Sequence, residues 1–593
     1  MSFSIYFRVI LLRLTIQSGK GYRKVKLGSN IVDKYEVAQI LREMALLIEL
    51  TDENPKKSIA YRRAASSIEV TENFNTLLEN NSLEEIPGIG KKISRMIVSL
   101  INENQLTYYE KLKNCIPDTV LELVNVGLSV KKIRELYENL QIVSIYDLKN
   151  ALDQKKITGI KGFSPFFLEK LQKRLERYLI EGNFLLYPKA NHIAELLKSK
   201  LSKVSTKVEI SGALRRKCEV INEINFVVTT NRLDNCRFLF LNHGFVHHIL
   251  NESSFFLRVL LKQGINASLQ IVEEKDFSLA LLTSTGNECH LKDLEAEAYK
   301  KQISLISQSH NFPGESHIYR LLDLNFIPPE LREGYGEVEA SKKNNFSDLI
   351  EEKDLKGTFH CHTIDSDGVN TIEEMVAAAQ KMGWQYIGIT DHSKSSHQAN
   401  GLSEERLIAQ IQWIRNFNKI IGPSFKVFSG LECDVLKDGG LDFDKELLKE
   451  LDFVIVSVHS LFKQEKDVMT NRIIKAIENP YTTMIGHLTG RLLRIRDPYK
   501  LDIPKVIDAC ISNDKIIELN SYPSRLDMDW RFWIHAKERG LKCSINPDAH
   551  SIHDLYNCHY GINIARKGWL KKDDVINTID LKQMIEFLKK RKP

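Results

Sequence analysis

The chain has 593 residues, which is too long for a single hydrophobic core and predicts about four domains. A hydrophobic fraction of 43% with 27% charged residues is typical of a globular protein and excludes a disordered or fibrous chain. The net charge of +6 is compatible with an anionic partner but does not identify one, so the function has to be inferred from motifs.

The N-terminal segment contains an apolar run that is interrupted by Arg8 and Arg13, and no small-residue cleavage site follows it. We therefore expect residues 1–26 to be a poorly ordered extension and not a signal peptide. No later segment has the roughly 18 uninterrupted apolar residues of a membrane span, so no membrane partner is expected. The nine cysteines are scattered singly, which indicates a reduced, cytoplasmic protein.

Residues 27–184 show the apolar spacing of short helices and predict two helical domains, 27–112 and 113–184. The segment PGIGKK within the first domain favours a tight turn between two helices, with backbone N–H groups free to bind a phosphate. The candidate DNA-binding residues of this helix-hairpin-helix motif are Gly88, Gly90, Lys91 and Lys92. Such a motif grips a nucleic-acid backbone without reading its sequence. The alternative is a plain helix turn.

Two weaker copies of the hairpin follow at residues 125–136 and 157–171. In these copies Ser129 and Ser164 replace the second glycine. Phosphate binding and a purely structural helix pair both remain open for them.

Residues 185–280 change to strand-like runs with interspersed helices, which predicts an α+β domain. Residues 281–335 are mixed, and the charged, turn-rich residues 336–356 are typical of a linker. Residues 357–593 alternate apolar strands with helical stretches. This alternation predicts a parallel sheet or barrel with functional residues at the C-terminal ends of its strands.

Imidazoles and carboxylates stand at the ends of these later strands, beginning with the segment HCH, in which alternation points both histidines to one face. The nine candidate metal ligands are His360, His362, Asp367, His392, Glu432, His459, His487, Asp548 and His550. A single histidine at a strand end is more often structural. Six histidines with three acids favour a site for several divalent metal ions, which would activate a hydroxide for phosphoester hydrolysis.

These motifs resemble the PHP (polymerase and histidinol phosphatase) superfamily, in which a distorted seven-stranded barrel holds three metal ions, usually manganese or zinc. The whole order of motifs, from the hairpin through G-x-x-R-R and IPPELREG to the PHP segment, resembles bacterial family-X DNA polymerases over residues 30–572. The resemblance implies a multidomain protein with an all-α helix-hairpin-helix N-terminal region. An α+β nucleotidyltransferase-like palm (185–280) and thumb (281–335) would follow, and then a C-terminal distorted (β/α)7 PHP barrel (357–593). It also implies that Asp548, His550 and His392 are catalytic.

The palm of that family carries G-S-x-R-R, then D-x-D, and later a third Asp that completes a two-metal site. Here Gly212, Arg215 and Arg216 match the motif, but Ala213 stands where the motif has Ser. The three Asp positions are occupied by Glu223, Asn225 and Ser268. Three formal negative charges become one, which predicts that polymerisation is lost or vestigial. For the two arginines, a solvated pair and a residual phosphate contact are both open. Arg95 stands where some members carry a Schiff-base lysine, so lyase activity is not expected.

The main hypothesis is a bacterial DNA-repair protein that hydrolyses phosphodiesters as a metal-dependent 3′-5′ exonuclease, with 3′-phosphatase or abasic-site endonuclease action as further options. Its substrate would be gapped, nicked or 3′-ended DNA, and the protein would be a cytoplasmic monomer, nucleoid-associated when bound to DNA. Arg491 and Arg494 could clamp the substrate phosphate or be surface charges. The alternatives are an active gap-filling DNA polymerase with an altered metal site, and a small-molecule phosphatase with a helical binding module.

Overall fold

The computed structural model describes residues 34–51, 55–71, 74–103, 126–181, 184–303, 312–343 and 346–592, with a few single residues between 109 and 124. The predicted extension 1–26 lies outside the described residues. The chain divides into two compact units, residues 1–183 and 184–593. Within the described ranges, no helix combines the length and the hydropathy that a membrane crossing requires.

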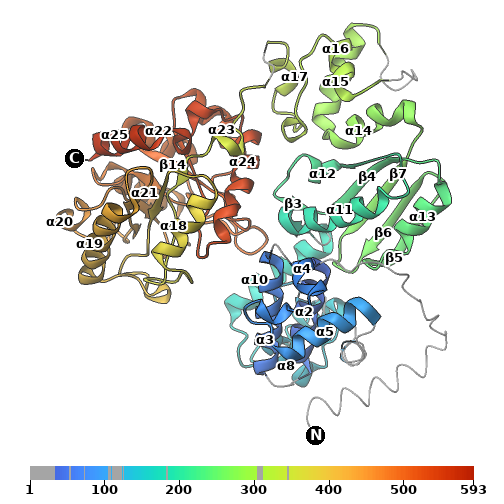
Figure 1. The fold of residues 1–593 in the computed structure, drawn as a ribbon, viewed down its shortest axis with the longest axis horizontal. Helices are drawn as coiled ribbons and strands as arrows, with labels where there is room; N and C mark the ends of the chain where they lie inside the picture. Colours follow the sequence, from blue (N-terminus) through green and yellow to red (C-terminus); the bar gives the residue numbers. More distant parts are fainter. Residues whose placement is uncertain are drawn as a thin grey trace. The chain divides into compact units, whose positions relative to one another are not determined.

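The first unit is helical, as predicted (Figure 1). Its described helices of six or more residues are α2 Lys34–Leu50, α3 Pro55–Val70, α4 Phe74–Glu79, α5 Lys91–Glu103, α8 Val130–Leu140, α9 Ile145–Asp153 and α10 Pro165–Glu181. One hydrophobic cluster runs from Val37 to Leu175 and includes side chains from all of these helices. The two predicted helical domains therefore share a core among the described residues, and the boundary at residue 112 stays a prediction.

The second unit begins with a mixed five-stranded sheet in the order β2-β4-β7-β6-β5, in which only β4 and β7 are parallel neighbours. The strands are β2 Lys207–Ser211, β4 Glu223–Thr229, β5 Val246–Glu252, β6 Phe256–Leu261 and β7 Asn266–Ile271. Helices α11 (Tyr187–Leu201) and α13 (Leu233–Leu241) cover one face and share its core with alternate strand residues. On the other face, α14 (Phe277–Thr285) packs on Val227.

A smaller helical layer follows the sheet and corresponds to the predicted thumb (Figure 1). Its helices are α14, α15 Glu288–Lys300, α16 Glu315–Leu321 and α17 Glu337–Ala340. The predicted boundary at residue 280 falls inside α14. Residues 336–356, predicted as a linker, are largely packed, because Val338 and Leu349 join the thumb core. The carboxylate of Glu337 accepts hydrogen bonds from two backbone N–H groups, and its Oε1 lies 2.7 Å from His290 Nδ1.

The C-terminal region is a parallel barrel of seven strands among the described residues, if β10 and β11 are taken as one strand interrupted at Gly430. The strands are β8 Gly357–Thr358, β9 Tyr386–Ile389, β10 Lys426–Ser429, β11 Glu432–Asp434, β12 Ile455–Ser457, β13 Met484–Ile485, β14 Ile516–Asn520 and β15 Cys543–Asn546. Two isolated bridges, His392 to Glu432 and Cys361 to Ala549, close the ring. The ladders are short and discontinuous, so the barrel is distorted, which confirms the predicted fold class.

Helices surround this barrel on the outside (Figure 1). They are α18 Ile372–Lys381, α19 Glu404–Ile421, α20 Lys445–Leu448, α21 Lys466–Glu478, α22 Ile503–Ser512, α23 Trp530–Glu538, α24 Cys558–Lys567 and α25 Leu581–Arg591. A hydrophobic cluster separate from the main core of this region contains the rings of Phe359, Phe428 and Phe453. A Cβ at Gly430 would approach the Phe453 ring to 2.3 Å, so glycine is required where strand and ring meet.

Candidate functional site

The predicted ligands come together at the C-terminal ends of the barrel strands. His360 and His362 follow β8, His392 follows β9, Glu432 begins β11, and His459 and His487 follow β12 and β13. Asp548 and His550 follow β15, and Asp367 comes from the loop after β8. The strand predicted through HCH ends earlier, at Thr358. Even so, both imidazoles lie in the site while Cys361 joins the hydrophobic core, as alternation predicted.

Glu432 lies at the centre of this group and is only 1% exposed. Its Oε2 is 2.9 Å from His392 Nδ1 and 3.4 Å from His360 Nε2, and its Oε1 is 2.8 Å from His487 Nε2. Asp548 Oδ1 lies 3.3 Å from His362 Nε2. A single carboxylate therefore faces several imidazoles, which is the arrangement of a bridging ligand between metal ions.

The remaining acid, Asp367, closes the exposed side of the site. Its Oδ1 is 3.4 Å from His550 Nε2, and its Oδ2 is 3.6 Å from His392 Nε2. Three overlapping groups have ligand atoms within 4.8 Å of one another: His362, Asp367, His392 and His550; His360, His362 and Asp548; and His392, Glu432 and His459.

Buried polar atoms without hydrogen-bond partners indicate, independently of any family resemblance, that the site can hold metal ions. Buried polar atoms normally have hydrogen-bond partners, and an orphan needs an explanation. Here the orphans cluster at the centre of the site: His360 Nε2, both ring nitrogens of His362, His392 Nδ1, Glu432 Oε2 and His487 Nδ1. Nitrogen and carboxylate donors that converge without partners suit a divalent cation.

Two outer carboxylates orient the imidazoles. Glu518 Oε2 lies 2.6 Å from His360 Nδ1, and Asp434 Oδ1 lies 2.9 Å from His459 Nδ1. Each contact leaves the Nε2 of that histidine facing the centre, since a ligating histidine is normally held through its other nitrogen. These outer partners were not predicted.

Strand β14 is the one barrel strand to which no predicted ligand was assigned, and it supplies Glu518 and Asn520. Asn520 Nδ2 donates to Glu518 Oε1 at 2.9 Å and to Asp548 Oδ2 at 3.1 Å. Asp391, beside His392, accepts from Thr363, Ser366 and Gln410 and so holds the loop that carries Asp367. The sequence did carry a signal for these outer partners. The segments ELN, ECD and TDH place polar residues in, or directly after, strands that are otherwise apolar and buried, where polar side chains are not expected.

The electrostatics of the centre follow from burial and from the opposed charges. Burial would raise the pKa of Glu432, but His360, His459 and His392 hold it well below its ordinary value. Burial would lower the pKa of His360, but Glu518, Asp548 and Glu432 raise it well above 6.5. The carboxylates are therefore ionised, and the centre attracts positive charge.

The predicted phosphate clamp needs correction at Arg491. Its guanidinium is buried and donates from Nε to the Arg525 carbonyl at 2.9 Å and from Nη1 to Asp529 Oδ2 at 2.7 Å, and also to the Leu526 carbonyl. Arg494 is exposed. The arginine that reaches a predicted metal ligand is instead Arg525, whose Nε lies 3.2 Å from Asp548 Oδ2. Sequence reasoning missed Arg525 because only the fold brings this loop to the site.

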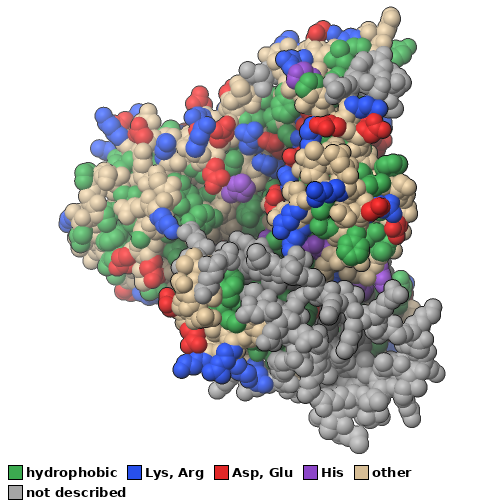
Figure 2. All heavy atoms as spheres, turned by 45° about the vertical axis from the view of Figure 1, so that its right-hand side comes forward, with side chains coloured by type: hydrophobic (Ala, Val, Ile, Leu, Met, Phe, Trp, Pro, Cys, Tyr) green, Lys and Arg blue, Asp and Glu red, His purple; other side chains and the backbone are tan. Residues whose placement is uncertain are grey.

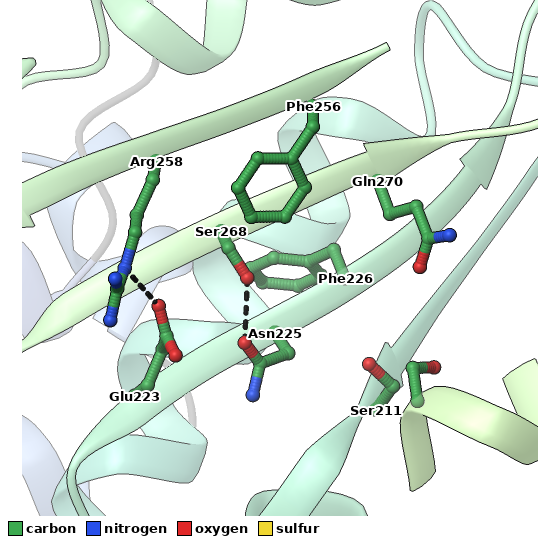
Figure 3. Close-up of a pocket in the computed structure, with 9 residues that line it drawn as sticks. Ser211, Glu223, Asn225, Phe226, Phe256, Arg258, Ser268 and Gln270 are labelled. Atoms are coloured by element: carbon green, nitrogen blue, oxygen red, sulfur yellow. Dashed lines mark hydrogen bonds and ion pairs between the residues drawn. The ribbon is translucent and has the colours of Figure 1, made fainter. Parts of the chain in front are cut away.

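The palm-like sheet carries a second candidate site, on the face opposite α11 and α13. Strand alternation brings the predicted acid positions together there, because Asn225 and Ser268 are register partners on β4 and β7. Ser268 Oγ donates to Asn225 Oδ1 at 2.6 Å, and Arg258 Nε on β6 donates to Glu223 Oε1 at 2.7 Å (Figure 3). The side chains at the three predicted acid positions are thus paired, whereas the buried Ser211 Oγ of the same site has no hydrogen-bond partner.

A cavity of about 310 Å³ opens beside these pairs. It is lined by Ser211, Glu223, Asn225, Phe226, Phe256, Arg258, Ser268, Gln270 and Ser284. Gly212 borders it with φ of 67°, and a Cβ there would approach Asn225 Nδ2 to 2.4 Å, so glycine is required at this turn. Hydroxyls, amides, two aromatic rings and one ion pair suit a hydrogen-bonding ligand better than two divalent ions.

The two arginines of the palm motif do not form a solvated pair. Arg215 makes a bidentate ion pair with Glu315 at 2.9 and 2.6 Å. Arg216 Nε donates to Glu333 Oε1 at 3.1 Å and its Nη1 to the Thr285 carbonyl at 2.7 Å. Both tie the sheet to the thumb region, and their contact with phosphate stays a prediction.

The three hairpins of the helical unit differ at the start of the second helix. Ser129 and Ser164 cap the helices that follow them, with their side chains accepting from the N–H groups of Lys132 and Phe167. These caps take up N–H groups that a phosphate would bind. In the first hairpin, Gly90 has no side chain and α5 begins at once with two exposed lysines. The first hairpin therefore fits a phosphate best. Arg95 is also exposed, on α5.

On the face that Figure 2 shows, Lys and Arg side chains alternate with Asp and Glu and do not gather into one basic patch. This agrees with the modest net charge of +6.

Comparison with known proteins agrees with these sites. Residues 358–522 match the family model described as PHP domain, and residues 33–106 match the helix-hairpin-helix domain. The chain is 32% identical to the DNA polymerase/3'-5' exonuclease PolX of Bacillus subtilis (strain 168) over 571 residues, 94% of this chain and 99% of that protein. It is also 31% identical to a probable phosphatase of Thermoanaerobacter sp. (strain X514), over 39% of this chain and 94% of the phosphatase.

Proposed function

The chain belongs to the bacterial family-X DNA polymerases that carry a C-terminal PHP domain, and on that premise we propose that it hydrolyses DNA phosphodiesters from the 3′ end at its PHP centre. The observation that supports this most is the convergence of the predicted ligands, of which eight fall into the three close groups and five have a buried atom without a hydrogen-bond partner. Action on a 3′-phosphate or at an abasic site would use the same centre, because each cleaves a phosphoester.

The nine residues would hold divalent metal ions, and the three overlapping groups support three ions. Ligands of this kind suit manganese and zinc. Such ions, when bound, lower the pKa of water toward neutrality and offset charge on the phosphoryl oxygens. Among the predicted catalytic residues, Asp548 and His392 are buried, whereas His550 lies on the more open side with Asp367.

Arg525 has the position to bind the substrate phosphate. Its Nε is committed to Asp548, and a guanidinium has further N–H donors in a fixed fork. Glu518 and Asp434 keep the imidazoles in place during the reaction, because each holds the nitrogen that does not face the centre.

The remaining parts of the chain would bind DNA. The first hairpin, with Gly88, Gly90, Lys91 and Lys92, offers backbone N–H groups and positive charge to a phosphate. The palm cavity would hold a nucleoside of a gap or 3′ end by stacking and hydrogen bonding. Its pairs Ser268–Asn225 and Arg258–Glu223 leave one acid where a two-metal site needs several, so we propose that polymerisation is lost.

The test is digestion of 3′-end-labelled and 5′-end-labelled DNA by the wild type and by Asp548→Asn, with primer extension run in parallel. We expect the wild type to shorten DNA from its 3′ end, Asp548→Asn to be inactive, and neither protein to extend a primer. Template-directed extension that persists in Asp548→Asn would show instead that the palm is an active polymerase.

A second candidate function is small-molecule phosphatase activity. It is favoured by the phosphatase relatives, which match only the C-terminal part of this chain, 39% of its length. Release of phosphate from sugar or amino-alcohol phosphates, together with DNA binding that is weak and insensitive to salt, would support it. DNA affinity that falls steeply with salt supports the main proposal.

A further inference from the structure

The end of the palm motif and the residues directly after it contact the PHP region. Four consecutive residues, Arg216 to Glu219, follow the short helix α12 (Gly212–Arg215) and lead into β3 (Val220–Ile221). Their partners belong to the IPPELREG segment and to the PHP region. The motif is therefore a structural junction in this chain, whatever remains of its chemistry.

Lys567, near the end of α24, is the first such partner and is only 1% exposed. Its Nζ donates to Glu333 Oε1 at 2.6 Å and to the Arg216 carbonyl at 2.9 Å. Glu333 also accepts from Arg216 and from the Cys218 thiol. A buried ammonium is stable only when its donors are satisfied, so these contacts fix the palm motif against the PHP region.

Glu219 makes the second contact, with two arginines that pack beside the loop next to the predicted metal site. Its carboxylate is 11% exposed and lies 3.7 Å from Arg491 Nη2 and 4.0 Å from Arg531 Nη1. Arg491 holds the carbonyls of Arg525 and Leu526, and both arginines pair with Asp529. These contacts surround the loop whose Arg525 reaches the metal ligand Asp548.

The charge balance explains why Glu219 belongs to this group. Two guanidinium groups converge on the segment from Arg525 to Asp529, and Asp529 supplies one negative charge for both. Glu219 supplies the second. Without it, the buried Arg491 and the half-exposed Arg531 would share the single carboxylate of Asp529, and the buried guanidinium would lose part of its compensation.

We propose that the degenerate nucleotidyl-transfer motif acts as a brace for the PHP reaction, in which Glu219, through Arg491 and Arg531, positions the 525–529 loop and thereby Arg525. This rests on the proposed phosphodiester hydrolysis at the PHP centre. Glu219 is a positioning residue, because it touches neither substrate nor metal ligand. The motif that once served nucleotidyl transfer supports hydrolysis at another site.

The experiment compares Glu219→Gln with Glu209→Gln in the full chain. Glu209 is the control, since it is a glutamate on β2 of the neighbouring palm sheet that pairs with Lys198 at 2.8 Å and makes none of these contacts. Hydrolysis of bis(p-nitrophenyl) phosphate, a small phosphodiester that needs no DNA docking, is measured together with metal content. Hydrogen exchange of residues 520–529 is measured on metal-free protein, as a readout independent of activity.

For Glu219→Gln we expect kcat to fall about tenfold, the lower end for outer partners of a metal site, with KM and metal content unchanged. Exchange in residues 520–529 should rise, and Glu209→Gln should match the wild type in every measurement. Wild-type kcat together with wild-type exchange in Glu219→Gln would overturn the brace while leaving the hydrolytic function intact. A wild type that cleaves neither the small diester nor DNA would instead refute the proposed function.

A double variant separates positioning from general support of the fold. Arg525→Lys alone should lower kcat, and Glu219→Gln added to Arg525→Lys should lower it by no more than about twofold further, because both act through one side chain. Independent, multiplicative losses in the double variant would show that Glu219 does not act through Arg525 and would overturn the proposal.

Discussion

The palm cavity and the PHP centre are both built at strands of one polypeptide unit, yet their polar atoms are used in opposite ways. In the PHP centre, outer carboxylates hold the Nδ1 atoms of His360 and His459, and several buried ligand atoms have no hydrogen-bond partner. In the palm, Ser268 pairs with Asn225 and Arg258 with Glu223, so the side chains at the predicted acid positions are paired, whereas Ser211 Oγ in the same cavity is not. A cation site keeps its donors apart and oriented, and side chains that pair with one another are less able to bind a cation.

The difference also shows in charge. The PHP centre retains three acids among six imidazoles, and Glu518, Asp434 and Asp391 add further carboxylates around it. The palm has one acid, and a guanidinium already neutralises it. The two regions differ in fold, one a mixed sheet and the other a parallel barrel, and each presents polar side chains from its strands, so the charge of those side chains decides which region suits cations.

Removal of metal gives the largest expected separation of the two regions. Chelation should lower phosphodiester hydrolysis at least about a thousand-fold, since the ions supply several kcal/mol of charge stabilisation. DNA affinity should change by less than about threefold, because the hairpin and the palm cavity bind without metal. The measurement is an exonuclease rate and a DNA dissociation constant on the same chelated sample at one salt concentration.

Re-addition of manganese or zinc is the control and should restore the rate. If DNA affinity collapses together with hydrolysis, the metal centre itself provides most of the DNA contact. The contrast between a metal-dependent and a metal-independent region would then be wrong.

The centre could be predicted largely from the sequence because its ligands are chemically distinctive and stand at fixed places. One imidazole after an apolar strand is more often structural, but nine imidazoles and carboxylates at such places favour a metal site, because parallel strands deliver their C-terminal ends to one edge. Ser268 was placed through the resemblance to the family's third acid position, and its register with Asn225 shows that the two positions meet. The predicted metal-ligand roles themselves await the experiments above.

Arg525, Arg491 and the packed linker could not be predicted, because their roles depend on contacts between distant segments. Arg491 and Arg525 look alike in sequence, and only the loop geometry decides which guanidinium faces Asp548 and which holds backbone carbonyls. Glu337 looked like one charge of a flexible linker. Its burial against His290 is a tertiary effect that overrides local composition.

A smaller effect should follow from Glu518→Gln, which keeps the shape of the side chain and removes its charge. Without that charge the His360 imidazole is held less firmly and is a weaker donor, so we expect metal affinity and kcat to fall about ten- to a hundred-fold. Titration of the metal-free protein with manganese gives the affinity. Glu450→Gln is the matched control, since Glu450 belongs to the same region but pairs with Arg415 in a half-exposed position. An unchanged affinity in Glu518→Gln would mean that Glu518 only fills space.

The smallest effect tests whether the palm can be turned back into a cation site. In the double variant Asn225→Asp and Ser268→Asp, two carboxylates replace a 2.6 Å hydrogen bond, and their repulsion should cost about 1 to 2 kcal/mol of unfolding free energy. Manganese at about a hundred times its dissociation constant should return about 2.7 kcal/mol, so the variant should become at least as stable as the wild type only when metal is present.

The measurement is the manganese-induced shift in Tm, compared with the wild-type shift so that the contribution of the PHP centre cancels. The control, Asn225→Ala with Ser268→Ala, loses the same hydrogen bond without gaining carboxylates and should show only the wild-type shift. A double-acid variant with no extra metal response would mean that the cavity has lost the geometry of a cation site as well as its charges, and the difference between the two regions would then lie in the backbone and not only in the side chains.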